Sequence, residues 1–221
     1  MFNEADEVPK PQSIIYGAGG HARELAFQLQ AAGTQVLAFV DDFNHGYVLK
    51  ETPVVSYQKA LTLASDATWF VAIGSIEGRV KLVERLSASS VMFGTFVSPH
   101  ALVAPTAKIG DGAQVFANVV VSANAELGDH VIVNYGTVVH HDVKVGSFCF
   151  IAANSTIAGN VEIGSRVWLG AGCVIRNGRQ GDPMRVGDGA FVGASACVVS
   201  NVDPGLTVIG VPARPRSNHD K

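Results

Sequence analysis

The chain has 221 residues, of which 48% are hydrophobic and 16% are charged, and its formal net charge is −3. This composition is typical of a compact folded protein with one large core or two smaller ones, and the lack of a basic cluster argues against nucleic acid as the main partner. No apolar run approaches the ~18 residues that a membrane-spanning helix needs, and the N-terminus MFNEADEVPKPQS lacks the apolar core of a signal peptide, so we expect a cytoplasmic protein.

The first hundred residues alternate between apolar runs and glycine-containing turns. Runs at 13–16, 36–40 and 69–73 predict three short strands. A helix is predicted after the first strand, ended by Gly33, with one apolar face made of Ala22, Leu25, Ala26 and Leu29. A second helical face follows the third strand and consists of Val80, Val83 and Leu86. This order predicts a small α/β domain with a parallel sheet.

The turn GAGGHA at residues 17–22 satisfies the G-x-G-x-x-A pattern of dinucleotide sites, and Asp41 and Asp42 follow about twenty residues later. The ~90 residues before the repeat are enough for one mononucleotide-binding half but not two. Backbone N–H groups at a glycine turn and helix N-terminus favour a phosphate, and His21 could add a donor. We interpret the turn as a nucleotide-sugar site, with NAD binding and a purely structural turn as alternatives.

From Val103 onward the sequence repeats every six residues. The first position of each hexad is aliphatic, at Val103, Ile109, Val115, Val121, Leu127, Val133, Val139, Val145, Ile151, Ile157, Ile163, Leu169 and Ile175. The fifth position is small or β-branched, and glycine recurs at the second position, where we expect tight corners. This period predicts a parallel β-helix with the first and fifth positions inside. The repeat breaks at 177–183, a predicted loop, and resumes one residue out of phase at Val186.

We therefore expect a small α/β domain over residues 1–98 and a β-helix with a C-terminal cap over 99–221. Within the β-helix, His140, His141 and Asp142 occupy outward hexad positions, so a lone histidine there would be an ordinary solvated residue. The acidic neighbour changes this interpretation, because a carboxylate can orient an imidazole as a general base. No third ligand recurs in register, so a metal site is not expected, and the three cysteines fit no metal spacing and are expected to be reduced, structural thiols.

Several motifs in order resemble one protein family over nearly the whole chain. They are GAGGHA, FVDD, AIGS, SPHALVAPTAKIGDG, VVHHDVKVG, TIAGNVEIG and VIGVPAR. The sequence is similar to the two-domain bacterial sugar acyltransferases, which include nucleotide-sugar N-acetyltransferases and sialic acid O-acetyltransferases. The resemblance implies a left-handed β-helix after a Rossmann-like domain, a homotrimer, and acetyl-CoA as acyl donor in the cleft between neighbouring β-helices.

The resemblance also implies roles for particular residues. The catalytic histidine corresponds to His141 with Asp142 as its acidic partner, and His140 replaces the family's usual leading carboxylate. Nucleotide-sugar contacts correspond to Gly19, Gly20, His21, Asp41 and Asp42. Acetyl-CoA contacts correspond to Phe150, Gly159 and Ala171.

One departure from the family concerns Phe150, which stands where many relatives carry a second histidine near the acetyl group. Either that contact is dispensable, or Asn154 or a neighbouring chain supplies it, or the acyl group differs. We expect acetyl transfer to the amino group of a nucleotide-linked amino sugar. Transfer to a hydroxyl, as in sialic acid O-acetylation, and a non-catalytic β-helix binding module are the alternatives. The sequence leaves open the base, the sugar and the acyl length.

Overall fold

The computed structural model describes residues 10–89 and 91–216. Two stretches that the sequence analysis used lie outside the described residues. They are residues 1–9, in which no signal peptide is expected, and residues 217–221, at the end of the expected cap. The chain forms two compact units. The first contains the chain up to Gly74 together with Leu82–Phe93, and the second contains Ser75–Lys81 together with the chain from Gly94 onward.

The first unit is built on a six-stranded sheet in which all neighbours are parallel except β3 and β4. In spatial order its strands are β3 (Tyr47–Leu49), β4 (Thr52–Val55), β2 (Gln35–Val40), β1 (Gln12–Tyr16), β5 (Thr68–Val71) and β6 (Met92–Phe93). The strands expected at 13–16, 36–40 and 69–73 correspond to β1, β2 and β5, so the expected parallel α/β unit is confirmed.

Three helices accompany this sheet in the sequence, α1 (Gly20–Ala31), α2 (Tyr57–Ala60) and α3 (Ile76–Ser87), and the division between the two units falls within α3. The apolar face predicted for α1 is buried, and Gly33 has a φ of +84° just beyond its end. The segment containing β3, β4 and α2 was not predicted, because its short elements carry too few apolar residues to show a period.

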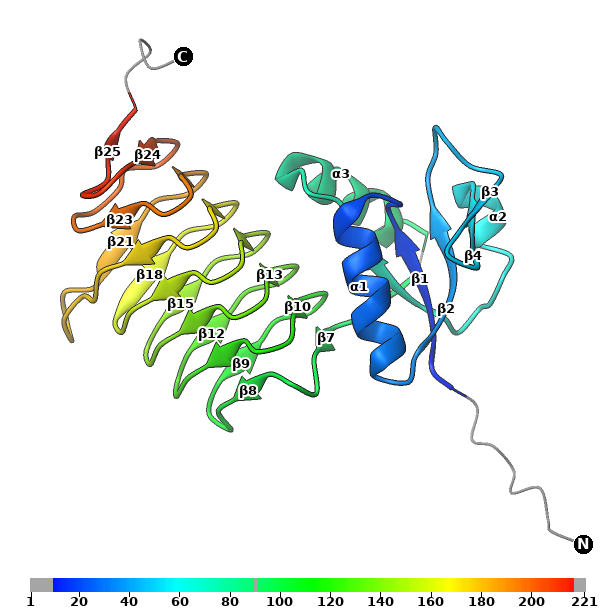
Figure 1. Cartoon of the computed structure of the whole chain (residues 1–221), viewed down its shortest axis with the longest axis horizontal. Coiled ribbons are helices and arrows are strands. Elements are labelled where there is room, and N and C mark those ends of the chain that lie inside the picture. Colours follow the sequence, from blue (N-terminus) through cyan, green and yellow to red (C-terminus); the bar gives the residue numbers. More distant parts are fainter. Residues whose placement is uncertain (1–9, 90, 217–221) are drawn as a thin grey trace, which may run out of the picture. The chain divides into compact units, whose positions relative to one another are not determined.

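The second unit is a left-handed parallel β-helix whose coils stack from β7 to β24 (Figure 1). Most coils contribute one two- or three-residue strand to each of three sheets. We name the sheets by the side chains that point outward. The aromatic face contains β7 (Phe96–Val97), β10 (Gln114–Val115), β13 (Ile132–Val133), β16 (Phe150–Ile151), β19 (Trp168–Leu169), β22 (Phe191–Val192), β24 (Thr207–Ile209) and β25 (Arg214–Pro215).

The other two faces differ in chemistry. The aliphatic face contains β8 (Leu102–Val103), β11 (Val120–Val121), β14 (Val138–Val139), β17 (Thr156–Ile157), β20 (Val174–Ile175) and β23 (Cys197–Val198). The charged face contains β9 (Lys108–Ile109), β12 (Glu126–Leu127), β15 (Lys144–Val145), β18 (Val161–Ile163) and β21 (Met184–Val186). On the charged face opposite charges alternate, as in the Lys108–Glu126 and Arg185–Glu162 ion pairs of 3.2 and 3.1 Å.

The interior of the β-helix confirms the predicted hexad pattern. First-position residues from Val115 to Ile175 are at most 4% exposed, and the fifth-position residues beside them are fully buried. Val186 pairs with Ile163, and Val192 pairs with Leu169, so the period resumes as predicted after the loop. The β-helix begins slightly earlier than expected, because Phe96 and Val97 already pair with β10. The boundary expected at residue 98 therefore lies a few residues too late.

The corners form for a different reason than the second-position glycines suggested. Those glycines have no positive φ; a Cβ on Gly110, Gly128, Gly146, Gly164 or Gly170 would instead lie 2.5–2.8 Å from backbone atoms of the next coil. The left-handed turn falls at the fourth position, which is often Asn because its short polar side chain tolerates this conformation. The non-glycine residues with positive φ there are Asn118, Asn124, His130, Asp142, Phe148, Asn154, Asn160, Arg166 and Ser195.

No helix among the described residues is both long enough and apolar enough to span a membrane.

Candidate active site

His141 and Asp142 lie at the corner between the aliphatic and charged faces, which we call the His141 corner. The Nδ1 atom of His141 lies 2.8 Å from Oδ2 of Asp142, and both side chains are about half exposed. Adjacent residues in a flat strand point to opposite faces, so this contact requires a bend. Asp142 supplies it, because its φ of +57° turns the backbone at the corner. The pair therefore forms within one chain.

Gly159 lies one coil beyond His141 at the same corner. A Cβ on Gly159 would lie 2.5 Å from Cε1 and 2.6 Å from Nε2 of His141, so the imidazole occupies the space that a side chain would fill. The backbone joins the two coils here, because Asn160 N donates to His141 O at 3.2 Å. His141 is thus held by a carboxylate on one side and by the backbone of Gly159 on another.

Asn124, one coil before Asp142, is a member of this cluster that the sequence analysis missed. Its Nδ2 donates to Oδ1 of Asp142 at 3.1 Å, which leaves Oδ2 facing His141. The hydrogen bonds from His141 and Asn124 lower the pKa of Asp142. Asn124 lies 18 residues, or three hexads, before Asp142, and this spacing is the signal in the sequence that could have predicted their contact. The carboxylate therefore stays ionised across the neutral range and can orient the imidazole.

The other proposed acetyl-CoA residues lie elsewhere on the chain. Phe150 is only 8% exposed on the aromatic face, where its ring stacks on Trp168 with centroids 4.3 Å apart and packs with Ile76 of the same unit. Ala171 and Asn154 lie at the second corner, between the aromatic and aliphatic faces. One chain therefore brings Gly159 to His141 but not Ala171 or Asn154. Contact of Phe150 with acetyl-CoA stays a prediction, and its ring has a structural role in this chain.

In the first unit the glycine turn lies between β1 and α1. Gly19 is the N-cap of α1, and nothing lies within 4 Å of a Cβ built on it, so the backbone is open there. Gly17 is the glycine that the fold requires, with a φ of +118° and a Cβ position 2.5 Å from Ala72 O. Gly20 begins α1 and His21 lies in its first turn. Open N–H groups at a helix N-terminus favour an anion.

Asp41 and Asp42 follow β2 but have different surroundings. The Oδ1 of Asp41 accepts hydrogen bonds from the backbone N of Phe43 and Asn44, at 2.9 and 3.0 Å, which shape the loop. The Oδ2 of Asp42 accepts from the Tyr16 hydroxyl at 2.6 Å and from Arg85 at 2.5 Å. Partial burial by itself raises the pKa of Asp42, but these two hydrogen bonds lower it overall. The Asp42 carboxylate therefore already has two side-chain partners within the first unit.

The cysteines are buried or partly buried. Burial raises the pKa of the Cys149 thiol to about 12, and the Sγ of this residue hydrogen-bonds Gly164 O at 3.0 Å, so it is no nucleophile. Among the described residues, no group of three or more histidine, cysteine or acidic side chains is arranged to hold a metal ion.

Comparisons with known proteins agree with this two-part organisation. Residues 12–86 match the model of the PglD N-terminal domain. Residues 106–141 and 142–177 match the bacterial transferase hexapeptide model of six repeats.

Whole-chain comparisons give the same result. GDP-perosamine N-acetyltransferase from Escherichia coli O157:H7 is 30% identical over 207 residues, which cover 90% of this chain and 94% of that protein. The match to UDP-N-acetylbacillosamine N-acetyltransferase of Bacillus subtilis (strain 168) is also 30% identical but spans only about half of each protein, 47% and 50%.

Among solved structures, the acetyltransferase domain of PglB from Neisseria gonorrhoeae FA1090 in complex with acetyl coenzyme A is 32% identical. It superposes with a TM-score of 0.85 and covers 94% of this chain and 100% of that one. The chain therefore belongs to the two-domain bacterial sugar acyltransferases, and it is an enzyme, an acyltransferase.

Proposed function

We propose that the enzyme transfers the acetyl group of acetyl-CoA to the amino group of a nucleotide-linked amino sugar. The observation that carries this proposal is the His141–Asp142 pair, with Nδ1 and Oδ2 2.8 Å apart at an exposed corner. Two relatives named as nucleotide-sugar N-acetyltransferases and a neighbour bound to acetyl-CoA support the choice of substrates.

In the proposed reaction His141 is the general base. With its Nδ1–H donated to Asp142, the imidazole keeps Nε2 as a proton acceptor. The acceptor amine attacks the thioester carbonyl, His141 removes a proton from the amine, and the thiolate of CoA leaves and is protonated. Asp142 holds the ring in one orientation and stabilises the imidazolium. No covalent intermediate on the enzyme is needed, so much of the rate gain comes from holding the two substrates together.

We assign the acceptor's nucleotide to the first unit. The open backbone at Gly19 and Gly20 and the N-terminus of α1 suit a phosphate, and His21 lies in the same turn. Asp41 suits a ribose or base donor better than Asp42, because the Asp42 carboxylate is engaged by Tyr16 and Arg85.

We also propose that the active unit is a homotrimer. The aliphatic face exposes a column of apolar side chains, including Leu102 at 69% and Val174 at 41%, flanked on one side by the His141 corner and on the other by the corner with Ala171. Cyclic assembly through a heterologous interface brings one corner of a chain to the other corner of its neighbour. That arrangement would complete an acetyl-CoA cleft whose residues are split between two corners in a single chain.

Replacement of the base tests the proposal. Because positioned proton transfer contributes about 10²–10⁴ in rate, we expect His141→Asn to lower kcat by that factor near neutral pH. The dissociation constants of CoA and nucleotide sugar, measured by calorimetry, should change little because the side chain acts mainly in the transition state. The matched control is His140→Ala, which should lose far less. A crippled His140→Ala beside a nearly normal His141→Asn would refute the assignment.

A further inference from the structure

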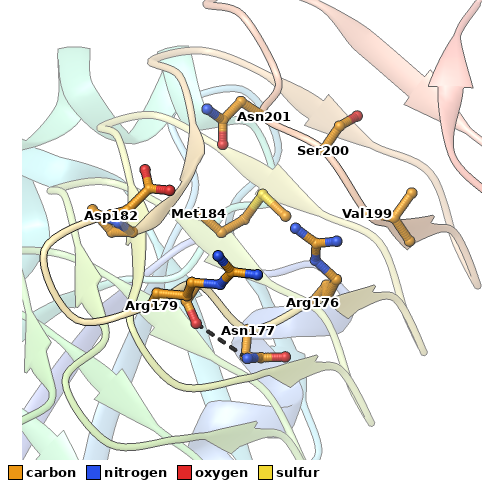
Figure 2. Close-up of a pocket in the computed structure, with 10 residues that line it drawn as sticks. Arg176, Asn177, Arg179, Asp182, Met184, Val199, Ser200 and Asn201 are labelled. Carbon is orange, nitrogen blue, oxygen red and sulfur yellow. Dashed lines mark hydrogen bonds between the residues drawn. The ribbon is translucent and has the colours of Figure 1, made fainter.

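Arg79, in the first turn of α3, is the largest fully buried side chain among the described residues, with 1% of its surface exposed. Other arginines of the second unit lie at its surface. Arg176 and Arg179, for example, extend into a polar pocket of about 550 Å³ beside the loop at 177–183 (Figure 2). Burying a cation costs free energy unless the groups around it compensate. The burial of Arg79 therefore points to a specific role for its guanidinium group.

The guanidinium group of Arg79 is bound by the backbone of one β-helix corner. Its Nη2 donates to Phe148 O at 2.7 Å and to Cys149 O at 3.3 Å, and its Cζ lies 5.8 Å from the centroid of the Phe150 ring. All four residues belong to the second unit. Burial lowers the pKa of Arg79 to about 10, so the side chain keeps its charge at neutral pH. The contact therefore consists of charge-assisted hydrogen bonds to two carbonyl groups.

The same turn of α3 is also held by an apolar contact. Ile76, which is 7% exposed, packs with Ile132 and Phe150 of the aromatic face. Ser75 precedes the helix and closes its first turn, because Arg79 N donates to Ser75 O at 2.9 Å. The start of α3 is thus attached to the β-helix by one polar and one apolar contact, both within the second unit.

The polar contact distinguishes one coil of a repeating structure. Successive coils lie about 4.8 Å apart and present similar backbones, so carbonyl groups alone would accept a guanidinium group at several levels. The corner position of Phe148 is occupied by His130 one coil earlier and by Arg166 one coil later. Arg166 is a cation and His130 becomes one when protonated, so both would repel a second cation. The charge of Arg79 therefore favours the Phe148 level, a register function that an apolar side chain of similar size lacks.

The start of α3 lies close in sequence to the proposed nucleotide site. A Cβ on Gly17 would lie 2.5 Å from Ala72 O, so the chain that follows β5 adjoins the glycine turn within the first unit. Only Ile73 and Gly74 separate Ala72 from Ser75, where the second unit takes over the chain. The anchored helix start and the glycine turn are thus joined by a very short length of backbone.

We propose that Arg79 is a positioning residue for acetyl transfer: by holding the start of α3 at one level of the β-helix, it limits the movement of an acceptor bound through the glycine turn. The inference rests on the proposed function, in which the first unit binds the nucleotide of the acceptor. A misplacement of about 1 Å at a reacting group can cost about 100-fold in rate. Loss of the anchor should therefore lower kcat while the affinity for each substrate stays the same.

Arg79→Met tests this role with two acceptors, a nucleotide-linked amino sugar and the same amino sugar without its nucleotide. The free sugar offers the first unit no nucleotide to bind, so Arg79 cannot position it. We expect kcat for the nucleotide-linked sugar to fall about 10–100-fold and kcat/KM for the free sugar to stay unchanged. Lys81→Gln, an exposed change in the same segment of α3, is the matched control and should alter neither. Equal losses with both acceptors, or no loss with either, would overturn the proposal.

Partial unfolding of the variant does not affect the comparison, because unfolded enzyme is inactive toward both acceptors. Ile76→Ala removes the apolar contact but keeps Arg79, and it should lower kcat for the nucleotide-linked sugar in the same selective way. Calorimetry with a nucleoside diphosphate should give the wild-type dissociation constant in both variants. Weaker binding would mean that Arg79 supports the nucleotide site itself, and the positioning role would be wrong.

Amide hydrogen exchange without substrates separates this inference from the proposed function. The first turn of α3 should exchange at least tenfold faster in Arg79→Met than in wild type, because the turn has lost its attachment to the β-helix. A wild-type enzyme that acetylates no nucleotide sugar would exclude the proposed function but would leave this measurement valid. Unaltered exchange in the first turn would refute the anchor whatever the acceptor is.

Discussion

At the scale of single residues, the His141 imidazole is oriented by groups from three successive coils. Asp142 contacts Nδ1, Asn124 holds the other carboxylate oxygen, and Gly159 leaves space for the ring. A base fixed in this way loses little entropy when the transition state forms. The effects of changing these residues should therefore appear in kcat rather than in folding.

Gly159→Ala should lower kcat, because its Cβ would overlap the His141 ring and displace it from Asp142. The φ of Gly159 lies outside the left-handed region, so alanine is compatible with the backbone itself. We expect kcat to fall at least tenfold, with an unchanged melting temperature. The double variant with His141→Ala should be no slower than His141→Ala alone. Additive losses would show that Gly159 acts independently of the histidine.

Asn124→Gly should weaken the orientation of Asp142 while keeping the left-handed corner, since glycine adopts a φ of +58° freely. Loss of one hydrogen bond to an exposed carboxylate is expected to reduce kcat/KM several-fold. The pKa of Asp142, followed by carboxylate NMR, should move up toward its ordinary value. Asn118→Gly changes the same residue type at the same hexad position and should leave both quantities unaltered. Equal effects in the two variants would mean that only the corner matters.

At the scale of elements, the end of β2 is joined to β1 and α3 by one polar cluster. Asp42 accepts from Tyr16 and Arg85, and the Arg85 guanidinium lies over the Tyr57 ring, 4.3 Å from its centroid. The cluster stabilises the first unit and fixes the strand end from which Asp41 projects.

Asp42→Asn should therefore destabilise the protein in a pH-dependent manner. The folded-state pKa of Asp42 is lowered, so its stabilising contribution is present above the ordinary aspartate range and is lost as pH falls through the folded pKa. We expect the melting temperature difference from wild type to be largest near neutral pH and to shrink below about pH 4. Asp66→Asn, an exposed change in the same unit, is the control. A difference that stays constant with pH would contradict this account.

At the scale of the whole molecule, the faces of the β-helix are suited to different surroundings. On the charged face, cationic and carboxylate side chains alternate, as expected of a surface exposed to solvent. The aliphatic face exposes Leu102 and Val174 and carries further apolar outward side chains, interrupted by Thr156, which favours a partner surface. A second copy of the chain is the partner that symmetry makes available.

Val120→Glu should separate the proposed trimer, because it puts a charge on the aliphatic face, on the strand next to β8, while its outward position spares the core. Light scattering should give three times the 23.1 kDa chain mass for wild type and a smaller mass for the variant, with loss of activity. Lys144→Glu on the charged face should remain trimeric and active. A monomeric wild-type protein at micromolar concentration would exclude the shared cleft.

Much of this molecule follows from the sequence because its determinants are local. Aliphatic residues every six positions can be buried only in a β-helix coil, and the glycine turn after a short strand predicts the start of α1. Short elements such as β3 and α2 escaped this reasoning, since β3 depends on pairing with β4 and α2 on packing against β2 rather than on a pattern of their own. The contact between His141 and Asp142 required knowing that the fourth hexad position is left-handed.

What the tertiary structure decided is which residues meet across coils and strands. Gly159 meets the His141 ring and Asn124 meets Asp142 because closure into three faces stacks residues 18 positions apart. The same stacking aligns the inserted loop with the proposed base, although the insertion shifts the sequence spacing by five residues. The pairing of Asp42 with Arg85, 43 residues later, likewise appears only when β2 and α3 pack against one sheet. Hexad spacing determines inward and outward directions, whereas the contacts between coils depend on how many residues each completed turn of the β-helix contains.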